Sequence, residues 1–442
     1  MRLSRGLALA VWLGSSALIS STTSGTGFSL PGVAYASSCA PVANNSGNQV
    51  ASSGVDTFAN MEKSFTDARA KEGCTTPLDL TANQGISEST WNGYSPQQQV
   101  FALYNAERQD RGLGTLTLDT TLMSQIDVNH SHEMNQYGYF GHGSPINNPP
   151  PATSIFDRLT VNPAIANTNK CCTLGENIAG NGSAAAAVFE WMYDDGSSYF
   201  GHRHSILGYN GSNGFGNYNW VGIGASTSSL YGMVFTTDFL QSSNYTPPAA
   251  ADTTAPTMSA PTVTGSAGGT VTPSATNVID SGASAGAAGL TGVRFYAGSP
   301  VDSTGNSTTV FGTQNGTTWT ASLNQSAGTA VHAVAVDGSG NYTDCTVGGG
   351  CVSSVSSGPT AARVTHLAVS HRGAQTVFRW SVAPNHQIAG FNLYAGRQRL
   401  NAHLIPSMQR TSFRYSTHWS GPGAFSLEIV MSNGEVVHVA AR

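Results

Sequence analysis

Histidine and carboxylate residues are concentrated in one stretch of this 442-residue chain. Five of its twelve histidines fall between positions 130 and 204, and several acidic residues lie in or near the same stretch. These residues are His130, His132, His142, His202 and His204, with Glu107, Glu133, Glu176, Glu190, Asp194 and Asp195. Zinc favours neutral imidazole and carboxylate ligands, and the same groups act as general bases near neutral pH. The composition of the stretch therefore predicts a divalent metal site or a general-base site.

The spacing argues against several simpler sites. His132 and Glu133 lack the second histidine that an HExxH zinc helix needs. His130 and His132 are two positions apart on a predicted helix, so they cannot both face one metal ion. No CxxC pair occurs for a four-cysteine zinc site, and no Gly-x-Ser-x-Gly occurs in a strand-turn-helix setting.

Short motifs in this stretch follow one another in a recognisable order. They are Asn105-Ala-Glu-Arg, His130-Ser-His-Glu-Met134, Tyr139-Phe-Gly-His142, Gly175-Glu-Asn-Ile-Ala179, Gly201-His-Arg-x-x-Ile-Leu207, Val221-Gly-Ile-Gly224 and Thr236-Thr-Asp-Phe239. The series resembles the CAP superfamily (the cysteine-rich secretory protein, antigen 5 and pathogenesis-related family) in its bacterial, secreted form. The resemblance covers residues 94–243 and nothing outside them.

The resemblance implies a three-layer α-β-α sandwich with a cavity, where two histidines and two acids converge and some members bind zinc or another divalent cation. Carried over by motif, His142 and His202 are the metal ligands, and Glu176 is the first acid and a candidate general base. Asp194 is placed at the second acid, with Asp195 as its neighbour; many members carry glutamate there. The alternative is a buried polar network that only stabilises the fold.

Local patterns predict the elements that position these residues. Ser95-Pro96 is typical of a helix start, and apolar residues at helical spacing follow until Gly112. We expect further helices over 119–134 and 184–192, and strands over 218–224 and 231–239. Residues 94–243 are therefore predicted to be α+β.

The rest of the chain has a different character. Residues 37–93 are polar and weakly periodic, which predicts a loosely packed extension, and residues 244–258 form a Pro/Thr/Ala linker. Alternating apolar positions then predict two all-β sandwiches, an immunoglobulin-like one over 259–358 and a fibronectin III-like one over 361–442. These modules resemble bacterial spacer and adhesion repeats. The histidines after position 361 have no convergent spacing, so no site is assigned to them.

The N-terminus and the cysteines predict export. Residues 1–36 have the charged start, apolar run and small-residue end of a signal peptide, and no later segment is apolar enough to span a membrane. Six cysteines in an exported chain favour disulfides. Cys345 and Cys351 form the easiest local pair, Cys39 with Cys74 is plausible, and the adjacent Cys171 and Cys172 leave the remaining pairing open.

Charge limits the partners. A net charge of −5 is too small to predict nucleic-acid binding. Residues 361–442 nevertheless hold eight arginines, no lysine and two glutamates, so this module carries +6. It could dock on an anionic cell-surface polymer, although the arginines are dispersed and a solubilising role is favoured.

Three functions follow from these patterns. The leading one is a secreted CAP protein whose cavity binds a divalent cation, a small ligand or a lipid, with β-modules for spacing or adhesion. The second is a metal-assisted hydrolase acting on peptide or cell-wall material. The third is a purely adhesive surface protein. Binding is favoured over hydrolysis.

Overall fold

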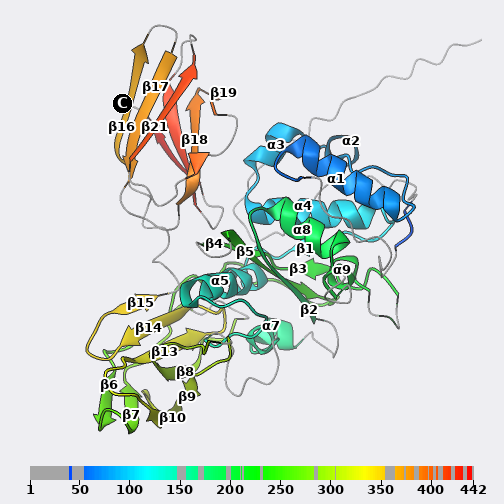
Figure 1. Cartoon of the computed structure of the whole chain (residues 1–442). Coiled ribbons are helices and arrows are strands. Elements are labelled where there is room, and N and C mark those ends of the chain that lie inside the picture. Colours follow the sequence, from blue (N-terminus) through cyan, green and yellow to red (C-terminus); the bar gives the residue numbers. More distant parts are fainter. Residues whose placement is uncertain are drawn as a thin grey trace, which may run out of the picture.

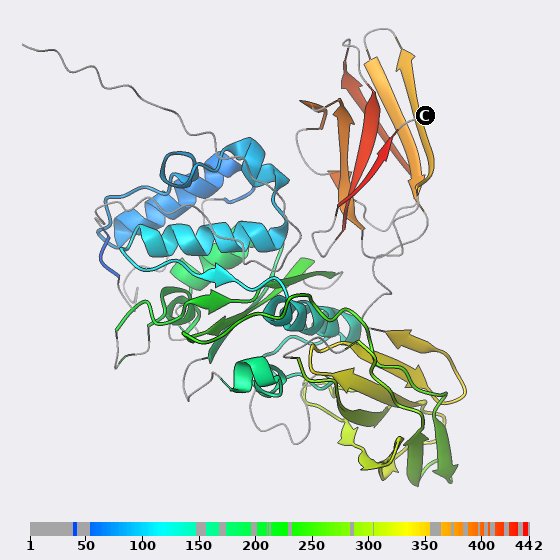
Figure 2. The same ribbon diagram turned by 180° about the vertical axis from the view of Figure 1, so that it is seen from behind.

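The computed structural model describes most of the chain between residues 39 and 440 (Figures 1 and 2). The described residues are 39–41, 54–146, 156–167, 174–195, 201–209, 211, 214–228, 232–282, 287–303, 305–353, 364–372, 375–382, 388–396, 398–401, 405–406, 412–419, 424–431 and 436–440. They form an α+β module followed by two modules of paired β-sheets. The predicted signal peptide and Cys171-Cys172 lie outside the described residues.

A five-stranded sheet is the centre of the first module. Its strands are β1 (Thr117–Leu118), β2 (Leu174–Asn181), β3 (Trp220–Val221), β4 (Gly224–Ser228) and β5 (Gly232–Leu240). The order is β1-β3-β5-β2, and β4 also pairs with β5. Only β1 and β3 run parallel among these pairs. The predicted strand over 218–224 is divided between β3 and β4, while the one over 231–239 matches β5.

Helices cover both faces of this sheet, with α1, α4 and α8 on one side and α5 on the other (Figure 1). The helices are α1 (Phe58–Lys71), α2 (Leu80–Gln84), α3 (Glu88–Gly93), α4 (Pro96–Gln109), α5 (Leu122–Tyr137), α6 (Asp157–Thr160), α7 (Pro163–Ala166), α8 (Ala184–Tyr193) and α9 (Gly201–Leu207). Helix α4 starts as predicted, with Ser95 and Gln98 forming a reciprocal capping box. In the described part of the chain, no helix has the length and apolar character needed to cross a membrane.

The N-terminal segment differs from our expectation of a loosely packed extension. Three helices lie between residues 58 and 93, and α1 buries Phe58, Met61, Phe65 and Ala68 in the main apolar core. These positions recur at helical spacing, and the Thr57 side chain caps the first turn. The polar residues between them concealed a short amphipathic pattern, so the prediction for this segment was wrong.

Helix α5 lies very close to the sheet at two glycines. A Cβ atom at Gly224 would clash with the main chain of Asp127 and Val128, and one at Gly222 would lie 2.6 Å from the Cβ of Met123. Only glycine lets the helix backbone approach the strand this closely. The Val-Gly-Ile-Gly motif therefore fixes the position of α5 against the sheet.

The second module consists of two five-stranded sheets, as the alternating pattern predicted. The strands are β6 (Thr262–Gly265), β7 (Thr270–Ala275), β8 (Leu290–Ala297), β9 (Val310–Phe311), β10 (Thr313–Asn315), β11 (Thr318–Thr320), β12 (Leu323–Asn324), β13 (Val331–Asp337), β14 (Tyr342–Thr346) and β15 (Cys351–Ser353). One sheet follows the order β15-β14-β13-β8-β9, and the other contains β6, β7, β10, β11 and β12. The predicted disulfide between Cys345 and Cys351 is present and joins β14 to β15.

The third module also contains two sheets, packed around Phe378, Trp380, Phe391 and Leu393. Its strands are β16 (Val364–Arg372), β17 (Gln375–Val382), β18 (Ile388–Ala395), β19 (Gln398–Arg399), β20 (Ile405–Pro406), β21 (Ser412–His418), β22 (Phe425–Met431) and β23 (Val436–Ala440). Strands β22 and β23 pair antiparallel, as the Asn433-Gly434 signal predicted.

Strand β13 is buried on both faces and connects the first two modules through its side chains. Ala333 and Ala335 face the interior of the second module. Val334 and Val336 belong instead to a cluster with Ile146, from the first module. Because side chains alternate across a strand, one face of β13 fills the sandwich and the other contacts the neighbouring module.

Candidate functional site

The site contains two histidine–carboxylate pairs. His142 lies in the loop after α5, and its Nδ1 is 2.6 Å from Oε1 of Glu176 on β2. His202 lies in the first turn of α9, and its Nδ1 is 2.7 Å from Oδ1 of Asp195, which follows α8. The structure thus brings together His142, Glu176 and His202, three residues selected from the sequence.

The two imidazole rings face each other across the site. Their centroids are 6.5 Å apart, and the ring planes are inclined by 28°. The His142 side chain is 40% exposed and that of His202 is 21% exposed, whereas the two carboxylates are at most 1% exposed. Each histidine therefore has a buried side that is held by an acid and an open side. Because Nδ1 is engaged in both rings, Nε2 is the atom left for a ligand.

The fourth residue of the site is Asp195, which corrects our assignment of Asp194. Helix α8 ends at Tyr193, and Asp194 occupies its C-cap with an exposed side chain. The backbone turns there, so the next carboxylate points inward and is buried. Asp195 accepts from His202 and, at 3.1 Å, from the backbone N–H of Arg203.

Arg158 supports the His142 half of the site. Its guanidinium forms an ion pair with Glu176 and lies 3.9 Å from Oδ2 of Asp238. It also donates to the backbone carbonyl of His142 at 3.0 Å. One buried cation therefore fixes both the carboxylate and the main chain of this pair.

The His202 half is supported by the sheet and α8. Asn177 on β2 donates to the carbonyl of His202 at 3.0 Å. The Trp191 ring lies 6.3 Å from the His202 ring, and its Nε1 donates to the backbone carbonyl of Ile178 at 3.0 Å. Glu176 and Asn177 are adjacent on β2, so this strand positions both histidines.

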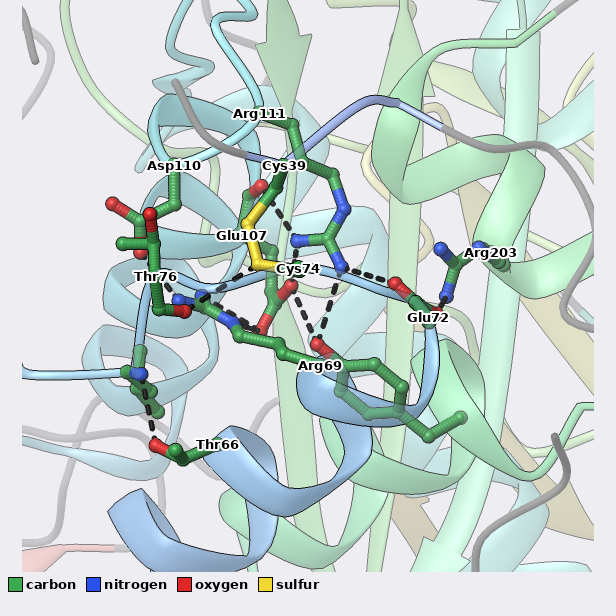
Figure 3. Close-up of a disulfide and its surroundings, with 12 residues drawn as sticks. Cys39, Thr66, Arg69, Glu72, Cys74, Thr76, Glu107, Asp110, Arg111 and Arg203 are labelled. Atoms are coloured by element: carbon green, nitrogen blue, oxygen red, sulfur yellow. Dashed lines mark hydrogen bonds and ion pairs between the residues drawn. A yellow bond between two sulfur atoms is a disulfide. The ribbon is translucent and has the colours of Figure 1, made fainter. Parts of the chain in front are cut away.

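The N-terminal helices reach this half of the site through buried charges (Figure 3). Glu72, directly after α1, pairs with Arg203 at 2.6 Å and with Arg111 at 2.9 Å. Arg203 also donates to the carbonyl of Met192 at 2.6 Å. A disulfide between Cys39 and Cys74 adjoins this cluster. The segment predicted to be a loose extension thus braces the residue that follows His202.

The remaining predicted histidines lie outside the site. His130 is buried in α5, and its Nε2 contacts the carbonyl of Gly141 at 3.1 Å. His132 faces Tyr342 of the second module, with ring centroids 6.5 Å apart. His204 packs on Tyr209 at 4.8 Å. None of the three joins the two histidine–carboxylate pairs.

His142 is held in its neutral form. Burial lowers the pKa of its imidazole to about 4, and the charges of His202 and Arg158 act in the same direction. A neutral imidazole at physiological pH has an available nitrogen lone pair, which metal coordination requires.

We expect His142 to titrate near pH 4 instead of the usual value of about 6.5. In NMR spectra its ring signals, assigned by their loss in His142→Ala, should stay constant from pH 8 to pH 5.5 and shift only below pH 5. The unfolded chain takes up this proton near pH 6.5, before the native state does, so the His142 contribution to stability declines as the pH falls from 6.5 toward 4. A titration midpoint near 6.5 would contradict this environment.

Comparison with known proteins does not assign this chain to a family. No protein-family model matches the chain. The uncharacterized protein YkwD of Bacillus subtilis (strain 168) is 29% identical over 180 residues, which span 40% of this chain and 59% of YkwD. This chain therefore covers less than two thirds of that relative. The ectodomain of mouse nectin-like molecule 4 is 14% identical, with 50% of this chain and 79% of that chain covered. Its TM-score of 0.15 is too low to assign a fold.

Proposed function

We propose that the first module is a CAP-superfamily domain that binds a divalent cation, with zinc as the best candidate, through Nε2 of His142 and His202. The observation that carries this proposal is the pairing of both Nδ1 atoms with buried carboxylates. In metal sites, a ligating histidine almost always donates its other N–H to a carboxylate, carbonyl or water, which fixes the tautomer and the ring orientation. A merely structural network needs neither two parallel pairs nor two open Nε2 atoms.

The residues present suit such a cation. The two imidazoles provide nitrogen ligands of the type zinc prefers, and the acids behind them increase their basicity. Two protein ligands leave coordination positions open for water or for an oxygen of a small ligand. A bound zinc ion would supply Lewis acidity there. The chain itself orients the two imidazoles and keeps His142 unprotonated.

Binding is favoured over hydrolysis by the position of Glu176, the candidate general base. One oxygen of its carboxylate holds His142 and the other pairs with Arg158. A general base must reach the proton that it abstracts, whereas this carboxylate is buried behind the imidazole. Glu176 is therefore suited to positioning His142.

The wider setting of the proposal is extracellular. The predicted signal peptide and the disulfides Cys39–Cys74 and Cys345–Cys351 fit an exported protein. The two β-modules would act as immunoglobulin-like and fibronectin-like spacers, and the basic third module could approach an anionic cell-surface polymer.

Zinc titration by calorimetry on the full chain tests the proposed site. We expect one ion per chain at this site and a loss of at least 100-fold in affinity in His142→Ala/His202→Ala. Asp195→Asn should weaken binding by about 10–100-fold, because it removes the partner that orients His202. His204→Ala is the matched control, since His204 lies in the same helix and outside the site. Unchanged binding in the double variant would overturn the assignment.

A further inference from the structure

A second group of ligand-type residues lies in the second module and the segment leading into it, outside the histidine site. Asp252, Asp280 and Asp337 each bring a carboxylate oxygen within 4.8 Å of the other two. They come from three separate segments: the residues before β6, the loop after β7 and the end of β13. Folding therefore assembles three negative charges that are far apart in the sequence.

Two of the three aspartates are buried and Asp280 is half-buried, and no cationic side chain among the described residues forms an ion pair with them. Asp252 is 3% exposed and Asp337 is 1% exposed. None of the ion pairs found between described residues involves any of the three aspartates. Like charges at this distance are costly unless something neutralises them.

Buried carboxylate oxygens without a partner indicate which kind of group neutralises these charges. Oδ1 of Asp252 accepts from the backbone N–H of Thr254 at 3.0 Å, but Oδ2 has no hydrogen-bonding partner among the described residues. Oδ2 of Asp280 is also buried without one. Buried carboxylate oxygens are normally satisfied, so two orphans in one cluster point to a missing ligand. A ligand that satisfies several carboxylate oxygens at once is a cation.

We propose that Asp252, Asp280 and Asp337 bind a calcium ion at the junction between the first two modules. The donors are oxygen atoms only, which hard cations prefer and zinc does not. They also come from three separate segments of the chain, which suits the flexible coordination of calcium better than the strict octahedron of magnesium. Affinities of about 10⁻⁴–10⁻³ M are typical of calcium sites in extracellular modules.

The position of the cluster gives the ion a mechanical role. Asn341 donates through Nδ2 to Oδ2 of Asp337 and to the carbonyl of Asp252, both at 2.8 Å. Its Oδ1 accepts from Asn129 and Gln125 of α5, at 2.9 and 3.3 Å. A single amide therefore links the carboxylate cluster to the helix that packs on the first module's sheet.

The turn from Asp337 to Asn341 makes a second contact with the first module, through Asn162. Asn162, just before α7, donates to the carbonyl of Gly338 at 2.7 Å and accepts from the backbone N–H of Ala288 at 2.9 Å. A Cβ at Gly338 would lie 2.7 Å from Oδ1 of Asn162, so a side chain there would obstruct the contact. Calcium bound at Asp337 would hold this turn in the shape that both contacts require.

Calcium titration of the full chain, followed by calorimetry and by thermal unfolding, tests the site. We expect one calcium ion per chain, and an unfolding temperature several degrees higher in millimolar calcium than in EDTA. Asp252→Asn and Asp337→Asn should each weaken calcium binding at least tenfold and reduce the calcium-dependent shift. Asp67→Asn, at an exposed carboxylate of α1, is the matched control and should behave as wild type.

Three outcomes would overturn the proposal. They are no calcium binding by the wild-type chain, calcium binding by Asp252→Asn and Asp337→Asn with the affinity of the wild type, or tighter binding of magnesium than of calcium. The wild-type titration decides the question even if a variant fails to fold. The His142→Ala/His202→Ala chain should keep full calcium affinity. This result separates the calcium site from the histidine site, so either proposal can fail alone.

Discussion

Replacing Glu107 with glutamine is expected to lower the free energy of unfolding of the first module by about 3–5 kcal/mol. Glu107 lies in α4 with a fully buried side chain, and its carboxylate pairs with both Arg69 and Arg111. It also accepts from the hydroxyl of Tyr193 at 2.8 Å. Glutamine keeps the shape but removes the charge, which leaves two buried guanidinium groups under-compensated.

The effect of this substitution depends on pH in a defined direction. Burial alone would raise the pKa of Glu107, but the charges of Arg69 and Arg111 hold it below its usual value of 4.5. Its contribution is therefore fully present above pH 4.5 and is lost as the pH falls through the lowered native value. The difference in stability between wild type and Glu107→Gln should be largest near pH 7 and should shrink in acid.

Urea unfolding followed by circular dichroism at 222 nm measures this difference, because the described helices all belong to the first module. Glu190→Gln is the matched control, since Glu190 is exposed on α8 and its loss should change stability by no more than about 0.5 kcal/mol. If Glu107→Gln unfolds within 0.5 kcal/mol of wild type at pH 7, the buried charge network does not stabilise the module.

This network also shows where prediction from sequence stops. Arg69 and Glu107 are 38 positions apart, and neither stands in a motif that indicates a partner. Helix α1 was overlooked because its four core positions are separated by polar and charged residues. The pairing of buried charged residues depends on the tertiary structure, so local sequence patterns do not predict it.

The histidine site was more accessible to prediction. His142, Glu176 and His202 could be selected because their residue types and motif order identified them, and the structure places all three together. Choosing between Asp194 and Asp195 required the exact end of α8, and helix ends are the least predictable feature of a sequence. Arg158, on the short helix α6, was not selected because a single arginine gives no sign of the carboxylate with which it pairs.

Replacing Gly224 with alanine is the second substitution with a large expected effect. The added methyl group would clash with the main chain of Asp127 and Val128 in α5, so no side-chain rotation can relieve it. Overpacking typically costs about 1–3 kcal/mol, and a clash with helix backbone should reach or exceed the upper end. We expect Gly224→Ala to lower the free energy of unfolding by about 3 kcal/mol or more.

The displacement of α5 should also affect the histidine site. Oδ2 of Asp127 accepts from the backbone N–H of Asp238 at 3.2 Å, and Asp238 lies 3.9 Å from Arg158, which holds Glu176. A shift of α5 would therefore loosen the support of His142, and the proposed zinc binding should weaken in Gly224→Ala although neither His142 nor His202 is altered. Gly182→Ala is the matched control, because a Cβ there meets no atom within 4 Å. If Gly224→Ala has the stability of the wild type, α5 can move away from the sheet at little cost in free energy. If the variant is destabilised but its zinc affinity is unchanged, the histidine site does not depend on the position of α5.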